Sequence, residues 1–362
     1  MLGRSKTTTL VLRPEASLTQ KMRVPMYTIL KSCHIPTRLV TWFALCFMLA
    51  ISDGAFAQTH GNASTRPLAS NVARVLQVGS YQGKAGAFST IQAAVDAALP
   101  GDWILIAPGT YHENQSAAVG VLITTPGLHL RGMDRNGVVV DGTYAGNGTC
   151  SSNPAFQNYG PGWGGRNGIE VFQVDSVSVE NLTVCNFLGD NYGNNGNQIW
   201  WNGGDGSGQI GMGSYSGAYL TASSTFYQAG TPNVAQYGIF VSNAKGPGAV
   251  IYSYASNMGD SAFYIGACAD CNATLRYVHA QNSPQGFSGS NSGGHLVLED
   301  SEWDHNQSGI VPSSLATYDP PSPQDGACPD SPGKSCTLIQ RNYVHDTTTP
   351  TPQPPGWRRR PP

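Results

Sequence analysis

The densest group of ionisable side chains in the sequence is the segment 299–305 (EDSEWDH), with His279 upstream of it. Carboxylates in this number could bind Ca²⁺, and Asp304 with His305 could protonate a sugar oxygen as a general acid. Side chains alternate along a strand, however. This alternation favours a solvated outer strand face with Trp303 partly buried.

Two Gly-rich segments carry tryptophans that could stack on sugar rings. Residues 144–167 contain Trp163, and residues 189–216 contain the pair Trp200 and Trp201. A sugar ring offers a flat C–H face to an exposed aromatic side chain, and long loops on a rigid scaffold are common binding sites. The alternative is that both tryptophans of the pair fold inward and seal the side of the fold.

The cysteines indicate disulfides more than a metal site. Six of them follow residue 57, namely Cys150, Cys185, Cys268, Cys271, Cys328 and Cys336. Cys328 and Cys336 bracket a Pro/Gly-rich loop, and we expect them to bridge each other. Cys268 and Cys271 could form half of a zinc site, but no second Cys-x-x-Cys or paired His accompanies them, so we expect a structural disulfide. We therefore predict no cofactor, with Ca²⁺ at the acidic segment as the alternative.

The N-terminal 57 residues resemble a signal peptide. The apolar run 39–51 (LVTWFALCFMLAI) follows Lys31 and Arg38, and a small-x-small ending at Ala57 follows it. Thirteen apolar residues are too few to span a bilayer, so we predict cleavage after Ala57 and no transmembrane span in the mature chain. A signal anchor is the alternative. The long stretch before Lys31 suggests a mis-started n-region.

Export and charge together exclude several partners. Residues 1–57 hold seven basic and two acidic residues, which leaves 13 Lys+Arg against 20 Asp+Glu, or about −7. An acidic chain with few lysines is a poor partner for nucleic acid. The match to a nucleotide motif at 206–211 lacks the preceding strand and the following helix that the motif requires. The match at 333–335 has Cys328 where a P-loop needs Gly, in a loop crowded with prolines, so no nucleotide is expected. We predict a secreted or cell-envelope protein whose cysteines meet an oxidising compartment.

Composition and spacing indicate an all-β solenoid. Only 12% of residues are charged, and 44 are glycine, which excludes a coiled coil or helical bundle. Four similar strand-like segments begin at spacings of 24, 24 and 23 residues, at Gly238, Ala262, Gly286 and Gly309. A repeat of this length marks stacked turns that share one core, with parallel strands about 4.8 Å apart. A β-sandwich is the competing fold, but it requires hairpins that the sequence rarely shows.

Asparagine ends most of the repeats, and a short helix begins the array. The closing residues are Asn186, Asn257, Asn282 and Asn306, with Asp346 in the last unit. The segment 88–99 reads as one amphipathic helix with Ser89 or Thr90 as its N-cap. We divide the chain into a signal peptide (1–57), a linker (58–74), the solenoid (75–346) and an atypical tail (347–362) that suggests a truncated or frame-shifted chain.

The segment FSTIQAAVDAALPGDWILIAPGTYHE (88–113) resembles the N-terminal cap and first turn of right-handed parallel β-helix proteins of the pectin-lyase-like superfamily. The repeats GIFVSNA, AFYIGAC, GFSGSNSGG and GIVPSS resemble the repeat region of the same superfamily. The resemblance covers residues 75–346 and implies an all-β, right-handed parallel β-helix with a short N-terminal capping helix. It implies no single activity, because this fold carries many.

In enzymes of that superfamily the substrate groove lies over one strand face. Here the inward file would be Ile239, Phe263, Phe287 and Ile310, which turns Phe240, Tyr264, Ser288 and Val311 outward. None of the outward four carries a carboxylate or a basic group, and Asp260 is the nearest carboxylate. The active-site signatures of polygalacturonases, pectate lyases and uronan epimerases are absent. The sparsely charged column favours binding over catalysis.

We therefore expect an exported β-helix protein that binds a polysaccharide or cell-surface glycan. The alternative is a polysaccharide-active enzyme of the uronan lyase, glycoside hydrolase or epimerase type. Catalytic candidates are Asp260, Asp304 and His305. Candidates for substrate binding are Phe240, Tyr264, Trp163, Trp200 and Trp201.

Overall fold

The computed structural model describes residues 73–146, 148–226, 233–313 and 337–347. The predicted signal peptide, nearly all of the linker and of the tail, and the predicted Cys328–Cys336 pair lie outside the described residues. No helix of the described part is long and apolar enough to cross a membrane.

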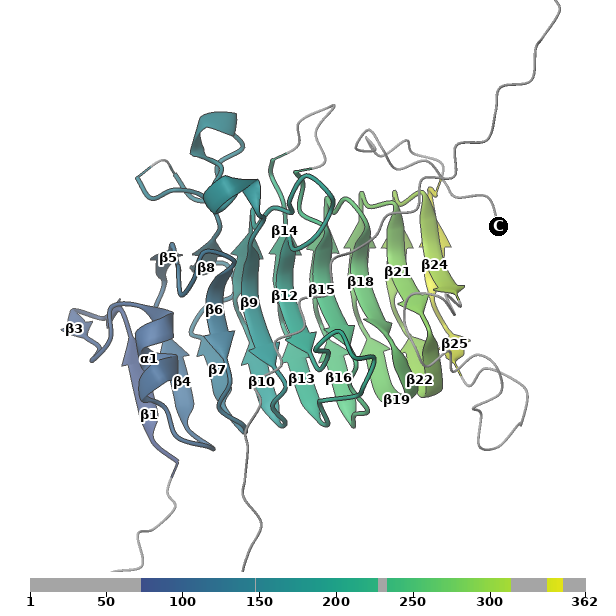
Figure 1. Ribbon diagram of the computed structural model, residues 1–362, viewed down its shortest axis with the longest axis horizontal. Coiled ribbons are helices and arrows are strands. Elements are labelled where there is room, and N and C mark those ends of the chain that lie inside the picture. The colour runs from purple at the N-terminus through teal and green to yellow at the C-terminus, as the bar shows by residue number, and fades with distance from the viewer. Residues whose placement is uncertain (1–72, 147, 227–232, 314–336, 348–362) are drawn as a thin grey trace, which may run out of the picture. The chain divides into compact units, whose positions relative to one another are not determined.

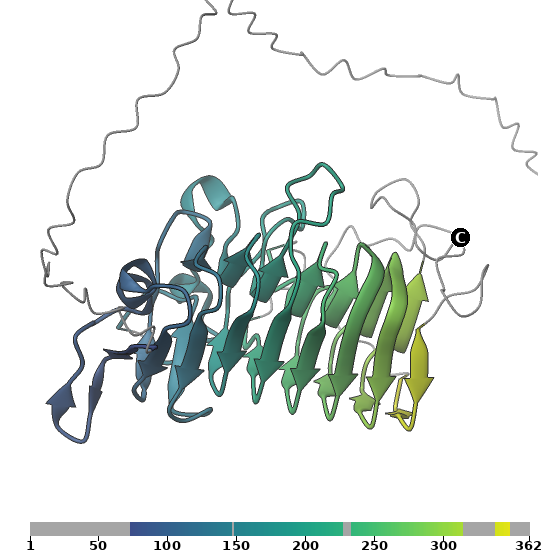
Figure 2. The same cartoon turned by 90° about the horizontal axis from the view of Figure 1, so that it is seen from below.

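The chain folds as a right-handed parallel β-helix, as predicted. Each complete turn contributes one strand to each of three sheets, and neighbouring strands within these sheets are parallel (Figures 1 and 2). The nine-stranded sheet comprises β1 (Val75–Val78), β4 (Trp103–Ile106), β7 (His129–Gly132), β10 (Val177–Glu180), β13 (Tyr215–Ala218), β16 (Gly248–Ile251), β19 (Cys268–Arg276), β22 (Ser292–Glu299) and β25 (Leu338–Gln340). Its strands are therefore bonded to the turn before and the turn after, and not to their neighbours in sequence.

The other two sheets follow the same rule. The eight-stranded sheet comprises β5 (Gly109–Tyr111), β8 (Val138–Asp141), β11 (Thr183–Cys185), β14 (Thr221–Ser223), β17 (Tyr254–Ser256), β20 (His279–Gln281), β23 (Glu302–Asp304) and β26 (Tyr343–His345). The seven-stranded sheet comprises β6 (Val119–Ile123), β9 (Asn167–Phe172), β12 (Asn197–Asn202), β15 (Tyr237–Ser242), β18 (Ser261–Gly266), β21 (Gln285–Ser290) and β24 (Ser308–Ser313). Strands β2 (Ser80–Tyr81) and β3 (Lys84–Ala85) form a small hairpin, and two 3₁₀ turns occupy Pro154–Phe156 and Pro161–Trp163.

One helix, α1 (Ile91–Ala97), lies at the N-terminal end of the coil. Thr90 is its N-cap, since its side chain accepts a hydrogen bond from the backbone N–H of Ala93. The helix is shorter than the predicted 88–99 because Ala98 already has extended backbone angles. Its buried residues are Ile91, Ala94 and Val95, which form part of the common core.

The predicted inward file is confirmed. Ile239 pairs with Phe263, Phe263 with Phe287, and Phe287 with Ile310 in adjacent turns. The first three are at most 1% exposed, and Ile310 packs against the same core from the last turn of this sheet. Stacked apolar residues of this kind form a continuous lumen, which supplies most of the burial that stabilises the fold.

Left-handed backbone at the corners turns the chain from one sheet to the next. After the eight-stranded sheet, Asn186, Asn257 and Asn282 have φ values between 52° and 63°. The predicted Asn306 is wrong by one residue, because His305 takes the corner with φ 52°. Asn306 instead accepts a hydrogen bond from the backbone N–H of Ser283 at 3.0 Å and is fully buried.

Two disulfides are present among the described residues. Cys268 and Cys271 are bonded to each other within β19, as expected, which rules out the zinc half-site. Cys150 is bonded to Cys185 and ties an early Gly-rich excursion to the eight-stranded sheet. Both bridges suit an oxidising compartment.

Phe263→Ala tests the inward file. Phe263 is 1% exposed and meets Trp303 edge-on at 6.0 Å, so its truncation should leave a cavity and lower the free energy of unfolding by about 3–5 kcal/mol. Urea unfolding followed by circular dichroism measures this loss. Tyr192→Ala is the control, because Tyr192 is 90% exposed and should change stability by at most about 0.5 kcal/mol. Equal losses in the two variants would contradict the packing described.

Candidate functional site

A groove of about 740 Å³ lies over the seven-stranded sheet. Strands β12, β15, β18, β21 and β24, which run in parallel in Figure 1, supply its floor. Its aromatic lining residues are Trp200, Tyr237, Phe240 and Tyr264, and its amide and hydroxyl lining residues include Asn202, Ser242, Asn243, Gln285, Ser288, Ser290 and Ser313. Asp260 is the one ionisable carboxyl among the described lining residues.

The aromatic side chains form one cluster because the strands pair in register. Trp200 aligns with Phe240, and Phe240 aligns with Tyr264. Trp200 stacks on Phe240 with ring centroids 5.2 Å apart, and Tyr237 stacks on Phe240 at 4.5 Å. Tyr264 meets Phe240 edge-on at 4.6 Å. The predicted outward residues Phe240 and Tyr264 thus line the groove together with Trp200.

The two adjacent tryptophans have opposite roles, which neither interpretation of the pair predicted. Trp200 lines the groove, where its Nε1–H donates to Ser242 Oγ at 3.0 Å. Trp201 is 0% exposed and packs in the lumen against Tyr215. Successive residues of a strand point to opposite faces, so only one of the two can reach a ligand. The prediction of Trp201 as a binding residue is wrong.

Trp163 lies on an excursion and not in the groove. It is 54% exposed and stacks on Tyr159 with ring centroids 4.6 Å apart. Tyr159 in turn meets Phe226 edge-on, in a small apolar cluster separate from the lumen. The structure therefore does not bring Trp163 to the predicted aromatic site.

Asp260 is a buried carboxyl immediately before β18. It is 7% exposed, and the hydroxyl of Ser261 donates to it. Burial raises the pKa of Asp260, while hydrogen bonds with Ser261 and Tyr237 oppose this shift without cancelling it. A carboxyl that keeps its proton more readily can donate a hydrogen bond to a ligand oxygen.

Glu170 is a second buried carboxyl on the same strand face, and it was missed. It aligns with Trp200 in the neighbouring strand and is 7% exposed. It accepts hydrogen bonds from Asn202 Nδ2 at 2.9 Å and from Asn167 Nδ2 at 3.2 Å. Burial raises its pKa, against the effect of these two amides. The sequence does contain a match that could have identified Glu170, because Gly168-Ile-Glu-Val171 resembles Gly238-Ile-Phe-Val241. Long excursions, however, move this segment out of the regular spacing of the repeats.

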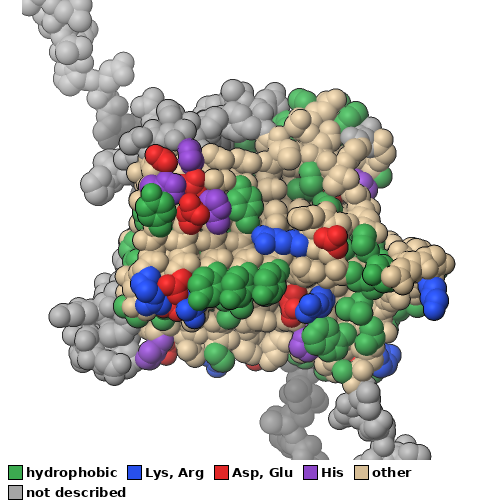
Figure 3. Space-filling model, turned by 180° about the vertical axis from the view of Figure 1, so that it is seen from behind, with side chains coloured by type: hydrophobic (Ala, Val, Ile, Leu, Met, Phe, Trp, Pro, Cys, Tyr) green, Lys and Arg blue, Asp and Glu red, His purple; other side chains and the backbone are tan. Residues whose placement is uncertain are grey.

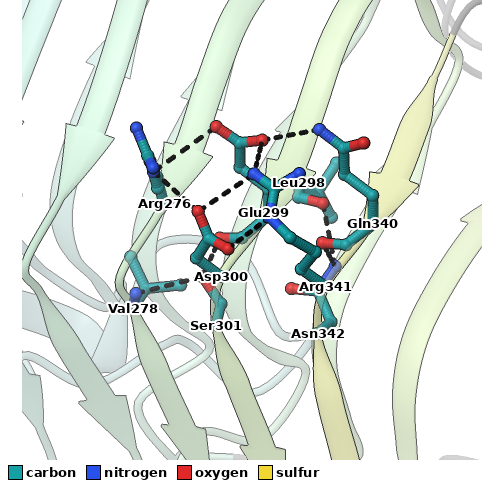
Figure 4. Close-up of polar contacts among 9 residues, drawn as sticks. All are labelled: Arg276, Val278, Leu298, Glu299, Asp300, Ser301, Gln340, Arg341 and Asn342. Carbon is teal, nitrogen blue, oxygen red and sulfur yellow. Dashed lines mark hydrogen bonds and ion pairs between the residues drawn. The ribbon is translucent and has the colours of Figure 1, made fainter.

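The acidic segment 299–305 divides between two environments, away from the groove. Arg276 and Arg341 enclose Glu299 and Asp300 at the corner after the nine-stranded sheet (Figure 4). Arg276 Nε lies 2.9 Å from Asp300 Oδ2, and Arg341 Nε lies 2.6 Å from Asp300 Oδ1. Hydrogen bonds, chiefly from Gln340 to Glu299 and from Arg341 to Asp300, lower the pKa of both carboxyls.

Asp304 and His305 belong to the eight-stranded sheet and its corner, and neither lines the groove. The structure thus separates them from Asp260, with which they were grouped as catalytic candidates. Trp303, predicted to be partly buried, is 0% exposed. It faces the lumen between its outward neighbours and meets Phe263 and Phe287 edge-on.

Comparison with known proteins gives only weak structural likenesses. No protein-family model matches the chain, and no curated protein matches it. Among solved structures, an alginate lyase from Paenibacillus sp. str. FPU-7 shares 14% identity over 75% of this chain and 76% of its own, with a TM-score of 0.42. A pectin methylesterase from Erwinia chrysanthemi shares 14% identity over 78% of this chain and 92% of its own, with a TM-score of 0.35. Likeness at this level carries no argument about fold or activity.

Asp260→Asn tests the environment of the buried carboxyl. Because the folded pKa is raised, proton binding favours the fold below the unfolded pKa of about 3.9, and this contribution is lost as pH rises through the folded pKa. The asparagine variant should therefore gain stability relative to the wild type between pH 4 and pH 7, measured as free energies of urea unfolding.

Asp205→Asn is the matched control. Hydrogen bonds from Ser207 lower the pKa of Asp205, so its ionised form stabilises the fold above the unfolded pKa of about 3.9, and this contribution is lost as pH falls through the folded pKa. The stability of this variant relative to the wild type should therefore stay nearly constant between pH 4 and pH 7 and change only below that interval. An equal gain of both variants between pH 4 and pH 7 would show that burial does not govern Asp260.

Proposed function

We propose that this β-helix protein binds a neutral polysaccharide chain in the groove over its seven-stranded sheet. The lining of the groove carries this proposal. It combines four clustered aromatic rings with hydroxyl and amide groups, and no lysine or arginine lines it in the described part of the chain. Apolar walls with a few uncharged hydrogen-bond partners suit sugars that carry hydroxyls and no charge.

The dimensions of the groove favour a chain over a single sugar. Lining residues come from five successive strands, from Trp200 on β12 to Ser313 on β24. With neighbouring strands about 4.8 Å apart, the floor extends about 19 Å along the axis. The aromatic cluster lies at one end of this floor and the serines Ser288, Ser290 and Ser313 at the other. One ligand chain could thus stack on the aromatic rings and, further along the groove, form hydrogen bonds with the serines.

Charge argues against acidic glycans as ligands. A polyuronate would require cations to neutralise its carboxylates, and the described lining residues include no Lys, Arg or His, with Asp260 as their one carboxyl. Burial favours the neutral form of that group, which donates to an ether or hydroxyl oxygen. We place this activity outside the cytoplasm, in keeping with the two disulfides and the proposed signal peptide at residues 1–57.

Trp200→Ala tests the binding proposal. Removing an aromatic ring from the cluster should weaken binding of a neutral polysaccharide by about tenfold or more, measured by affinity electrophoresis or calorimetry against neutral and acidic glycans. Tyr192→Ala, on an excursion outside the groove lining, should bind as the wild type does. A preference for polyuronates, or an equal loss in both variants, would refute the proposal.

A polysaccharide-active enzyme is the second candidate, and the buried Asp260 carboxyl in the groove favours it. Asp260 and Tyr237 are hydrogen-bonded partners, and the protonated carboxyl could act as a general acid. Glu170 cannot complete a pair of hydrolytic carboxyls, because three strand spacings, about 14 Å, separate β9 from β18. Inverting glycosidases hold their carboxyls only about 6.5–9.5 Å apart.

Asp260→Asn distinguishes catalysis from binding. If the groove is catalytic, this variant should lose the release of reducing ends by about 100-fold or more, whereas Glu170→Gln should keep most of it. Chain shortening of neutral polysaccharides, followed by reducing-end assay, measures both. If the wild type binds a neutral polysaccharide but does not shorten it, the proposed binding function stands and the proposed enzymatic activity is contradicted.

A further inference from the structure

A second group of chemically active side chains lies on the outer face of the eight-stranded sheet. Strands β20, β23 and β26 pair in register, so that His279 aligns with Glu302 and Gln281 aligns with Asp304. In the next turn Asp304 aligns with His345. Residues two apart on a strand share a face, which brings these side chains into one patch. Figure 3 shows this side of the molecule, where histidines and carboxylates gather together.

Asp304 is the centre of the patch. It is 3% exposed, and His279 Nε2 lies 2.5 Å from its Oδ1. Gln281 Nε2 donates to Oδ2 at 2.7 Å, and His305 Nδ1 contacts the same oxygen. A buried carboxylate surrounded by imidazoles is a strong metal ligand held in place by its neighbours.

We propose that His279, Glu302 and Asp304 bind a divalent transition-metal ion of the Zn²⁺ class. One ligand atom from each of the three lies within 4.8 Å of the others. In a tetrahedral zinc site, bonds of about 2.0–2.1 Å place ligand atoms about 3.3 Å apart. The hydrogen bond between His279 and Asp304 has to open by less than 1 Å, roughly, and Glu302 has to close in. Glu302 can do so, because its side chain is 45% exposed.

The chemistry of the ligands selects the metal. Ca²⁺ prefers six to eight oxygen ligands, whereas one imidazole with two carboxylates suits Zn²⁺ or a neighbouring transition metal. Glu299 and Asp300 do not add oxygens, since Arg276 and Arg341 already pair with them. The acidic segment therefore supplies two metal ligands and not a calcium cage.

Two features complete the site. His345 Nε2 lies 3.1 Å from Glu302 Oε1, which places a further imidazole beside the metal position. A depression of about 600 Å³ next to it is lined by His279, Glu302 and Tyr343 and gives access from solvent. The ion can therefore enter and can retain a water molecule or ligand in an open position. This site is independent of the groove and of any function proposed there.

Titration of Zn²⁺ into the full chain, without a histidine tag, tests the proposal by calorimetry. We expect one Zn²⁺ per chain. His279→Ala and Glu302→Gln should each weaken binding by about tenfold or more while leaving the circular dichroism spectrum unchanged. Co²⁺ added in place of Zn²⁺ should give visible absorption in the wild type that both variants lose.

His295→Ala is the matched control. His295 Nδ1 lies 3.0 Å from Asp270 Oδ1 on the nine-stranded sheet, a single histidine–carboxylate pair without a second carboxylate, and its loss should not change Zn²⁺ affinity. Absence of Zn²⁺ binding in the wild type, or an equal loss in the His295 variant, would overturn the assignment. So would Ca²⁺ binding that Glu302→Gln abolishes and His279→Ala retains.

Discussion

The structure depends on one constraint: each turn is hydrogen-bonded in register to the turn before and the turn after. The spacing between strands, about 4.8 Å, then becomes the spacing between equivalent side chains. A residue type that repeats every two dozen positions is converted into a column. Apolar columns fill the lumen, left-handed residues form the corners, and outward columns form binding surfaces. The inward file Ile239–Phe263–Phe287 shows this conversion most directly.

The sequence predicts the parts of the fold that this constraint governs. Spacings of 24, 24 and 23 residues were enough to place the file and the outward Phe240 and Tyr264 correctly. The error at the last of these corners came from residue type and not from spacing. Val250, Leu275 and Leu298 are aligned in successive turns, and each lies seven residues before its corner, at Asn257, Asn282 and His305. The adjacent Asn306 was expected there only because it is an asparagine. Trp201 and Trp303 point inward because side chains alternate along a strand, although nothing in their residue type requires it.

The sequence predicted only part of the candidate site. Glu170 belongs to the same outward column as Trp200 and Phe240, but the excursions on either side of β9 conceal the repeat. Side-chain contacts between turns could not be predicted from the sequence either. The alignment of His279 with Glu302 depends on the number of residues in one complete turn, and the approach of His279 to Asp304 depends on side-chain orientation. The spacing of the sequence predicts the alignment of His279 with Glu302, but it does not predict the contact between His279 and Asp304.

Two faces of one coil carry different chemistry as a result. The face over the seven-stranded sheet is aromatic and nearly free of charge among the described residues, whereas the face over the eight-stranded sheet gathers carboxylates and imidazoles near its C-terminal end. We propose that in-register stacking makes the first of these faces a groove for a neutral glycan. A crystal structure with a bound neutral oligosaccharide should show sugar rings over the column Trp200–Phe240–Tyr264, above an aligned inward file. Sugar bound elsewhere, or a file out of register, would contradict the proposed groove.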